Sequence, residues 1–109
     1  EFAAFLATLD PIPLLVISSD MNHYADEQTT RRLDRMALDA LETRDPLRLW
    51  KTVRENRISM CGIVPAVFVL ETLRQMGRLN ECELVGYTTS GEVSGRLDRV
   101  VGYAGVLFR

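Results

Sequence analysis

The sequence predicts an α/β domain in which helices pack against a small sheet. Its 109 residues are enough for one domain. Apolar residues recur at helical spacing in several stretches, and short apolar runs rich in β-branched residues alternate with them. The expected order is helix, strand, helix, helix, helix, strand, strand, which is typical of an α/β layer protein.

The first two predicted elements are a short helix and a buried strand. Residues 2–9 have apolar side chains at helical spacing, and the two prolines of "DPIP" (residues 10–13) end that helix. Residues 14–17, "LLVI", form a continuous apolar run. Such a run predicts a strand that is buried on both faces, as in a parallel sheet.

Three helices are predicted next. Asp26 or Thr29 caps the first, which has an apolar stripe from Leu33 to Leu41 and places Asp34 off the stripe among charged residues. The second begins at Asp45-Pro46, a cap followed by proline, and runs to about residue 55. The third covers about residues 63–76, with Pro65 in its first turn and Gly77 at its end.

The last two predicted elements are strands over residues 83–89 and 100–108, separated by the glycine-bearing loop "SGEVSG". Two of the three strands have a central, buried character, and no edge strands are evident. The chain also starts abruptly, without an initiator methionine. We therefore expect residues 1–109 to form a single partial domain.

Composition narrows the classes of partner. The 13 basic and 15 acidic residues give a net charge of −2, which argues against a nucleic-acid surface. No apolar run approaches the roughly 20 residues of a membrane span. The two cysteines are too few for a disulfide scaffold, so we expect them to be thiols in a reducing cytoplasm.

The stretch "VISSDMNHYADE" (residues 16–27) holds the only histidine, His23, directly after the predicted strand. Ligands of α/β sheets gather beyond the carboxyl ends of strands. Histidine can act there as an acid or base or bind a metal, and a carboxylate such as Asp20 would orient its ring. The alternative is a surface histidine in a loop, with Asp20 capping a turn.

The second candidate is Cys61 in "SMCGIVP", at or just before a predicted helix N-terminus. The positive end of a helix dipole favours the thiolate, which binds metals, and Gly62 permits close approach of a ligand. The alternative is a small, buried, apolar cysteine. Met60 could offer a soft sulfur ligand, although core packing is the more ordinary role, and Cys82 is expected to be structural.

Four motifs taken in order, "SSDMNHY", "NRISMCGIVPAVFVLETL", "LVGYTTSGEVSG" and "VVGYAGVLF", resemble the C-terminal half of the Memo family. Prokaryotic members of that family are often called AmmeMemoRadiSam system protein B. The resemblance implies a central sheet with helices on both faces, as in class III extradiol, non-heme iron dioxygenases. Only the C-terminal part of that fold would be present here.

The resemblance also implies roles for the candidate residues. Cys61 would be a metal ligand, His23 would bind the metal or move protons, and Asp20 would orient His23 or bind the metal. Iron or copper is the expected cofactor, because a thiolate replaces the carboxylate of the dioxygenases and favours soft or redox-active ions. A shell of about four ligands needs more than these residues, so the chain alone is not expected to retain the metal.

The sequence leaves three functions open. The chain could be the C-terminal half of a metal-dependent oxidoreductase, a non-catalytic module that binds a small molecule or peptide in a dioxygenase-like pocket, or an inert structural half. The expected partner is the missing N-terminal half of the same protein. A severed sheet would leave an unpaired strand edge, so self-association is also expected. The central geometric requirement is that the His23 ring and the Cys61 thiol face the same cavity.

Overall fold

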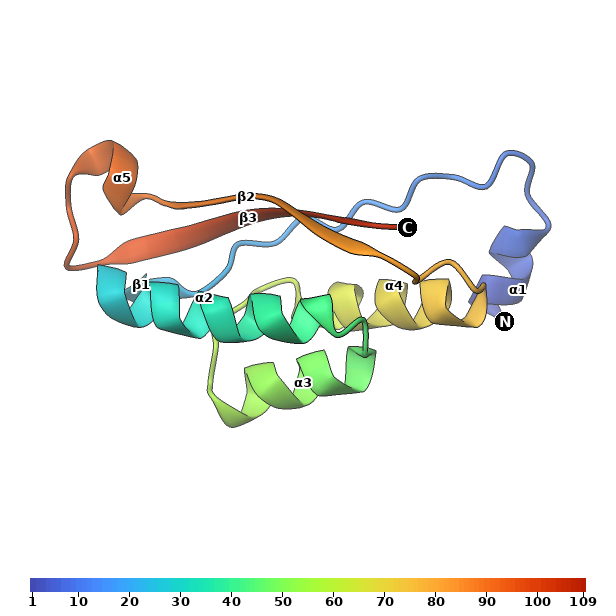
Figure 1. Cartoon of the computed structure of the whole chain (residues 1–109), viewed down its shortest axis with the longest axis horizontal. Helices are drawn as coiled ribbons and strands as arrows, with labels where there is room; N and C mark the ends of the chain where they lie inside the picture. The colour runs from blue at the N-terminus through green and yellow to red at the C-terminus, as the bar shows by residue number, and fades with distance from the viewer.

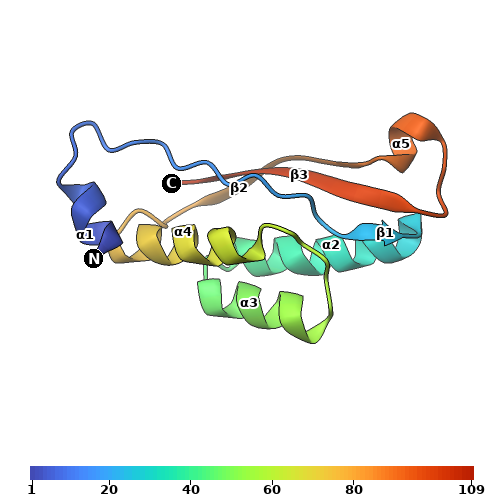
Figure 2. The same ribbon diagram turned by 180° about the vertical axis from the view of Figure 1, so that it is seen from behind.

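The structure is an antiparallel sheet with two long helices on one side of it and a third helix beyond them, away from the sheet (Figures 1 and 2). The computed structural model describes residues 1–109. The strands are β1 (His23–Ala25), β2 (Cys82–Thr89) and β3 (Val100–Phe108), in the spatial order β1-β3-β2. The helices are α1 (Phe2–Ala7), α2 (Glu27–Glu42), α3 (Pro46–Glu55), α4 (Ile63–Gln75) and α5 (Gly91–Ser94).

The predicted helices are confirmed, and their caps explain where they begin and end. The Asp26 carboxylate accepts a hydrogen bond of 2.7 Å from the Thr29 amide at the start of α2. Asp45 accepts from the amides of the first turn of α3, with Pro46 as the first helical residue. Gly77, just beyond α4, has a φ of 70°, which favours glycine after a helix end.

The two C-terminal strands are also confirmed, but the sheet is antiparallel rather than parallel. Strands β2 and β3 form a long hairpin, in register from Cys82 opposite Phe108 to Thr89 opposite Gly102. The short helix α5 occupies the loop between them, where the sequence predicted only a glycine-bearing loop. Helices α2, α3 and α4 all lie on one side of this hairpin, so the expectation of helices on both faces is not met within the chain (Figures 1 and 2).

The strand predicted over residues 14–17 is wrong. The segment is extended, but none of the backbone hydrogen bonds involves residues 10–20. Leu14 and Val16 are 86% and 80% exposed, whereas Leu15 and Ile17 are half-buried. The run is therefore covered on one face only, because a strand also needs a neighbouring strand and this segment has none here. The first strand is instead β1, which contains His23.

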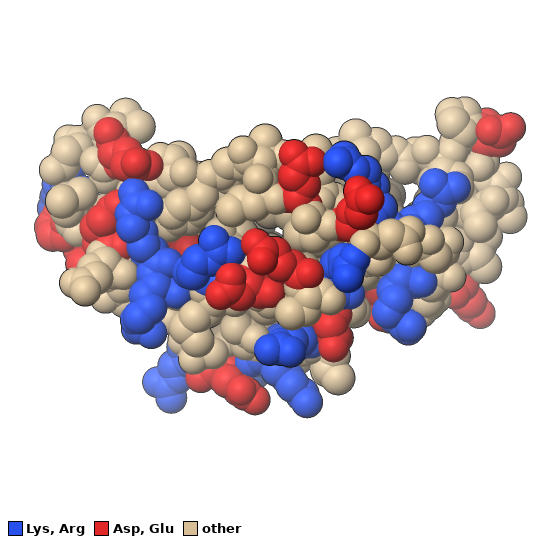
Figure 3. Space-filling view, in the orientation of Figure 1, with Lys and Arg blue, Asp and Glu red and all other residues tan.

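The core has two parts: one lies between the sheet and helices α2 and α4, and the other lies between these two helices and α3. Leu49, Leu70 and Val100 are almost completely buried there. The outer surface of the helices carries interleaved basic and acidic side chains (Figure 3), including the ion pairs of Arg35 with Asp39 and Glu42. The longest helix, α2, has 16 residues, and no helix has the length and apolarity of a membrane-spanning one.

Candidate metal centre

Three side chains with metal-binding atoms come together at one end of the extended segment. One atom each from Asp20, His23 and Cys61 lies within 4.8 Å of the other two. Asp20 and His23 belong to the extended segment and β1, whereas Cys61 precedes α4, some forty residues later. The structure thus brings the His23 ring and the Cys61 thiol close together. That they face a shared cavity and bind a metal stays a prediction.

The imidazole of His23 offers a free nitrogen to this space. Its Nε2 is buried and has no hydrogen-bond partner, and the nearest carboxylate oxygen, Asp20 Oδ2, is 3.5 Å away. A buried polar atom without a partner is uncommon and calls for a physical explanation. A metal ion held between Nε2, the Asp20 carboxylate and the thiol would provide one, so these residues fit a metal.

Cys61 is a free, exposed thiol, which contradicts the alternative of a buried apolar cysteine. Its Sγ lies 3.7 Å from Ser19 Oγ. The amide of the next residue, Gly62, donates to the same hydroxyl at 2.8 Å. The close approach expected at Gly62 therefore exists, but it is made by Ser19 rather than by a ligand. The two segments that carry the cluster are held in direct contact at this point.

A second set of hydrogen bonds holds the same two segments beside His23. The His23 amide donates to Ser59 Oγ at 2.7 Å. The amide and the hydroxyl of Ser59 both donate to Asn22 Oδ1, at 3.1 and 3.0 Å. Asn22 is only 3% exposed. The two segments are thus joined twice, by Ser59 before Cys61 and by Gly62 after it.

This arrangement is anchored to helix α2 by a buried carboxylate. Asp34 is 0% exposed, and it accepts hydrogen bonds from the Asn22 amide at 2.7 Å and from the Tyr87 hydroxyl at 2.5 Å. Burial raises the pKa of the Asp34 carboxyl, and these two hydrogen bonds act against that rise. Burial and the bond to Asp34 likewise raise the pKa of Tyr87. Gly102 on β3 exchanges backbone hydrogen bonds with Met21 and Asn22, which completes the anchor.

Sequence reasoning missed Asn22, Asp34, Ser59 and Tyr87. Asn22 and Ser59 stood inside the motifs that attracted attention, but neither is a metal ligand by type. Asp34 was placed on the solvated face of α2 because it is charged. Its spacing of four and seven residues from Leu38 and Leu41 puts it on the buried face, and that spacing was the signal that could have found it. Met60 is 7% exposed and belongs to the apolar core. Cys82 is half-buried on β2, and burial raises its thiol pKa, consistent with a structural role.

The protein is therefore an α/β protein with a candidate metal site that consists of one carboxylate, one imidazole and one thiol. The family model described as "Memo-like protein" matches residues 2–107. The chain therefore belongs to the Memo family, as the motifs indicated.

Relatives support the same assignment. The chain is 34% identical over 110 residues to a MEMO1 family protein of Aquifex aeolicus, covering 99% of this chain and 41% of that protein. It is 34% identical over 101 residues to one of Methanopyrus kandleri, with coverage of 93% and 35%. It is 38% identical over 104 residues to one of Thermotoga sp. strain RQ2, with coverage of 94% and 36%. The chain thus spans well under half the length of these relatives.

Proposed function

We propose that the chain is the C-terminal part of a Memo-like protein and contributes half of a metal-binding, redox-active pocket. The observation that carries the proposal is the cluster of Asp20, His23 and Cys61 donors within 4.8 Å, together with the unpartnered Nε2 of His23. No core-packing role explains an exposed thiol, a half-exposed carboxylate and a bare imidazole nitrogen at one point.

The donor set favours iron or copper. A thiolate is a soft ligand that suits copper(I) and redox-active iron, whereas imidazole suits both metals and carboxylate suits harder ions. When bound, such a metal would supply one-electron chemistry. Cys61 would anchor it, and Asp20 would ligate it or orient the His23 ring. His23 would either complete the ligand set through Nε2 or use that atom to move a proton to or from a substrate.

The remaining ligands would come from the N-terminal half of the same protein. Three donors fall short of the roughly four or more that a closed metal shell takes. We call the cluster a half-site for that reason. The extended segment of residues 12–20 makes no backbone–backbone hydrogen bonds and exposes Leu14 and Val16, so a strand of the missing half could pair with it. In this proposal the completed sheet would be dioxygenase-like, with helices on both faces.

Two unpaired thiols suit a reducing compartment, so the proposal places the protein in the cytoplasm.

The test is the metal content of the protein at its natural full length, with its affinity for copper(I) and iron(II). Cys61→Ser and His23→Ala are compared with Cys82→Ser, a matched cysteine outside the cluster. We expect Cys61→Ser to lose most of the metal and Cys82→Ser to retain it. A His23→Ala protein that keeps its metal but loses redox activity would assign His23 to proton transfer. If neither Cys61→Ser nor His23→Ala alters metal retention or redox activity, the proposal is wrong.

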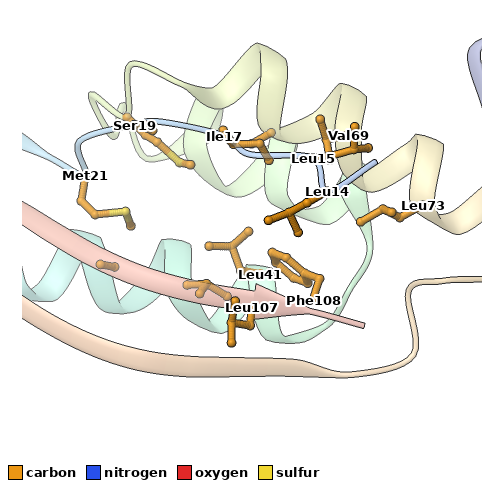
Figure 4. Close-up of a pocket in the computed structure, with 14 residues that line it drawn as sticks. Leu14, Leu15, Ile17, Ser19, Met21, Leu41, Val69, Leu73, Leu107 and Phe108 are labelled. Carbon is orange, nitrogen blue, oxygen red and sulfur yellow. The ribbon is translucent and has the colours of Figure 1, made fainter. Parts of the chain in front are cut away.

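One observation favours a second function, a non-catalytic module that binds a small molecule or peptide. A cavity of about 170 Å³ lies between the extended segment, α2, α4 and β3 (Figure 4). Of its 14 lining residues 13 are hydrophobic, and the exception is Ser19, the neighbour of Cys61. Cavities of about 150 Å³ with apolar walls bind benzene or xenon, so the occupant would be a small apolar molecule rather than a peptide. Saturable xenon-induced NMR shifts of Ile17 and Leu41 that persist in Cys61→Ser would support this function, and their absence would exclude it.

A further inference from the structure

We infer that Ser59 is a positioning residue of the half-site: its hydroxyl sets the distance between the imidazole of His23 and the thiol of Cys61. This inference rests on the proposed function, because it concerns the same cluster of donors. Ser59 itself offers no atom to the cluster, and its role is to join the two segments that do.

The Ser59 hydroxyl is used in both directions. Its oxygen accepts the His23 amide at 2.7 Å, and its proton goes to Asn22 Oδ1 at 3.0 Å. The Ser59 amide donates to the same Oδ1 at 3.1 Å. A side chain here must therefore accept one hydrogen bond and donate another, which only a hydroxyl does in so small a space.

The position of Ser59 in the chain makes these bonds relevant to the donors. Ser59 lies two residues before Cys61, and it binds the backbone nitrogen of the residue that carries the imidazole. Donors must be held to within about 0.5 Å of a productive geometry, and polar partners behind the ligands supply that constraint. The partner here, Asn22, is rigid, because it is 3% exposed and its backbone amide donates a hydrogen bond to the buried Asp34 carboxylate.

Loss of this bridge should loosen the half-site without unfolding the protein. Ser59 is exposed, so truncation removes little packing. The contact between Ser19 and Gly62 still joins the two segments on the other side of Cys61. An exposed position also leaves room for one more methyl group, so Ser59→Thr keeps the hydroxyl and Ser59→Val copies the shape of threonine without it.

The experiment titrates the full-length protein with Co²⁺ as the probe and follows the thiolate-to-cobalt charge-transfer band. Wild type, Ser59→Ala, Ser59→Val and Ser59→Thr are compared, with Ser94→Ala as an exposed serine outside the cluster. We expect Ser59→Ala and Ser59→Val to bind Co²⁺ about 10–100-fold more weakly, the usual effect of removing a partner behind a metal ligand. Ser59→Thr and Ser94→Ala should stay close to wild type.

Hydrogen exchange of the His23 amide in the metal-free protein provides a second readout. The amide should exchange faster in Ser59→Ala and Ser59→Val and keep its protection in Ser59→Thr. Equal losses in Ser59→Val and Ser59→Thr would show a packing effect and overturn the inference.

Other outcomes separate this inference from the proposed function. If Ser59→Ala and Ser59→Val bind Co²⁺ as wild type does while Cys61→Ser does not, the Ser59 inference is wrong and the metal proposal stands. If wild type and Cys61→Ser bind Co²⁺ equally or not at all, the Ser59 inference and the metal proposal are both wrong. The exchange data then show only whether the hydrogen bond from the His23 amide to Ser59 exists.

Discussion

Gly62 and Ser19 are so close that a methyl group on Gly62 should force apart the two segments that carry the metal donors. An alanine Cβ there would lie 2.7 Å from Ser19 Oγ and 3.1 Å from the carbonyl oxygen of Ser18, and closer still to Ser19 Cβ. Carbon atoms pack best at about 3.5–4.0 Å, so the segments would have to separate by something on the order of 1 Å. The backbone of Gly62 has a φ of −91°, which alanine tolerates, so the effect is steric.

The magnitude follows from three contributions. Overpacking costs about 1–3 kcal/mol, and loss of the hydrogen bond from the Gly62 amide to Ser19 costs about 0.5–1.5 kcal/mol. Alanine also restricts the unfolded chain, which returns about 0.4–1 kcal/mol. We expect Gly62→Ala to lower the free energy of unfolding by about 0.5–4 kcal/mol and the metal affinity by about 10–100-fold.

Urea denaturation measures the first quantity, and Co²⁺ titration of the full-length protein measures the second. Gly86→Ala is the matched control, because a Cβ at that position meets nothing within 4 Å. A Gly62→Ala protein that matches Gly86→Ala in both stability and metal affinity would refute the account of how the two segments are held.

Three further predictions concern the buried carboxylate, the exposed edge and the isolated chain. Burial raises the folded-state pKa of Asp34 above its ordinary 3.8, so the unfolded chain ionises first and the stability due to Asp34 declines as pH rises above about 4. The unfolding free energy of wild type minus that of Asp34→Asn, measured by urea titrations at several pH values, should therefore decrease as the pH rises above about 4. An increase over that range would contradict the burial argument. Leu14 and Val16 are 86% and 80% exposed, and replacing both with lysine should reduce self-association of the isolated chain in light scattering. A wild-type chain that is monomeric at high concentration would contradict the proposal that this segment is an open pairing edge. The isolated chain should lose iron or copper on desalting while the full-length protein retains it, and tight retention by the chain alone would disprove the half-site.

The helix boundaries could be predicted because local signals decide them. Asp26, Asp45 and Gly77 each act within one turn of the helix that they begin or end. The strand over residues 14–17 could not be decided in this way, because pairing depends on another segment of chain. Its apolar run was sufficient to predict extended backbone but not a hydrogen-bonded neighbour.

The candidate site shows the same difference between local signals, which the sequence reveals, and contacts between distant segments, which it does not. The single histidine and the thiol near a helix N-terminus were visible as residue types, and the family motifs joined them. The bonds that place them were not visible, because Ser59, Asn22 and Asp34 are common polar residues whose roles depend on contacts between distant segments. The burial of Asp34 contradicts its charge but agrees with its helical spacing to the buried Leu38 and Leu41. It is possible because the Tyr87 hydroxyl and the Asn22 backbone amide donate hydrogen bonds to the carboxylate inside the core.

X-ray absorption at the metal edge tests the central claim most directly, with the full-length protein loaded with zinc as the probe. The account predicts one sulfur at about 2.3 Å and nitrogen or oxygen ligands at about 2.0–2.2 Å, with the sulfur shell absent in Cys61→Ser and present in Cys82→Ser. A wild-type spectrum without sulfur, or a sulfur shell that persists in Cys61→Ser, would contradict it.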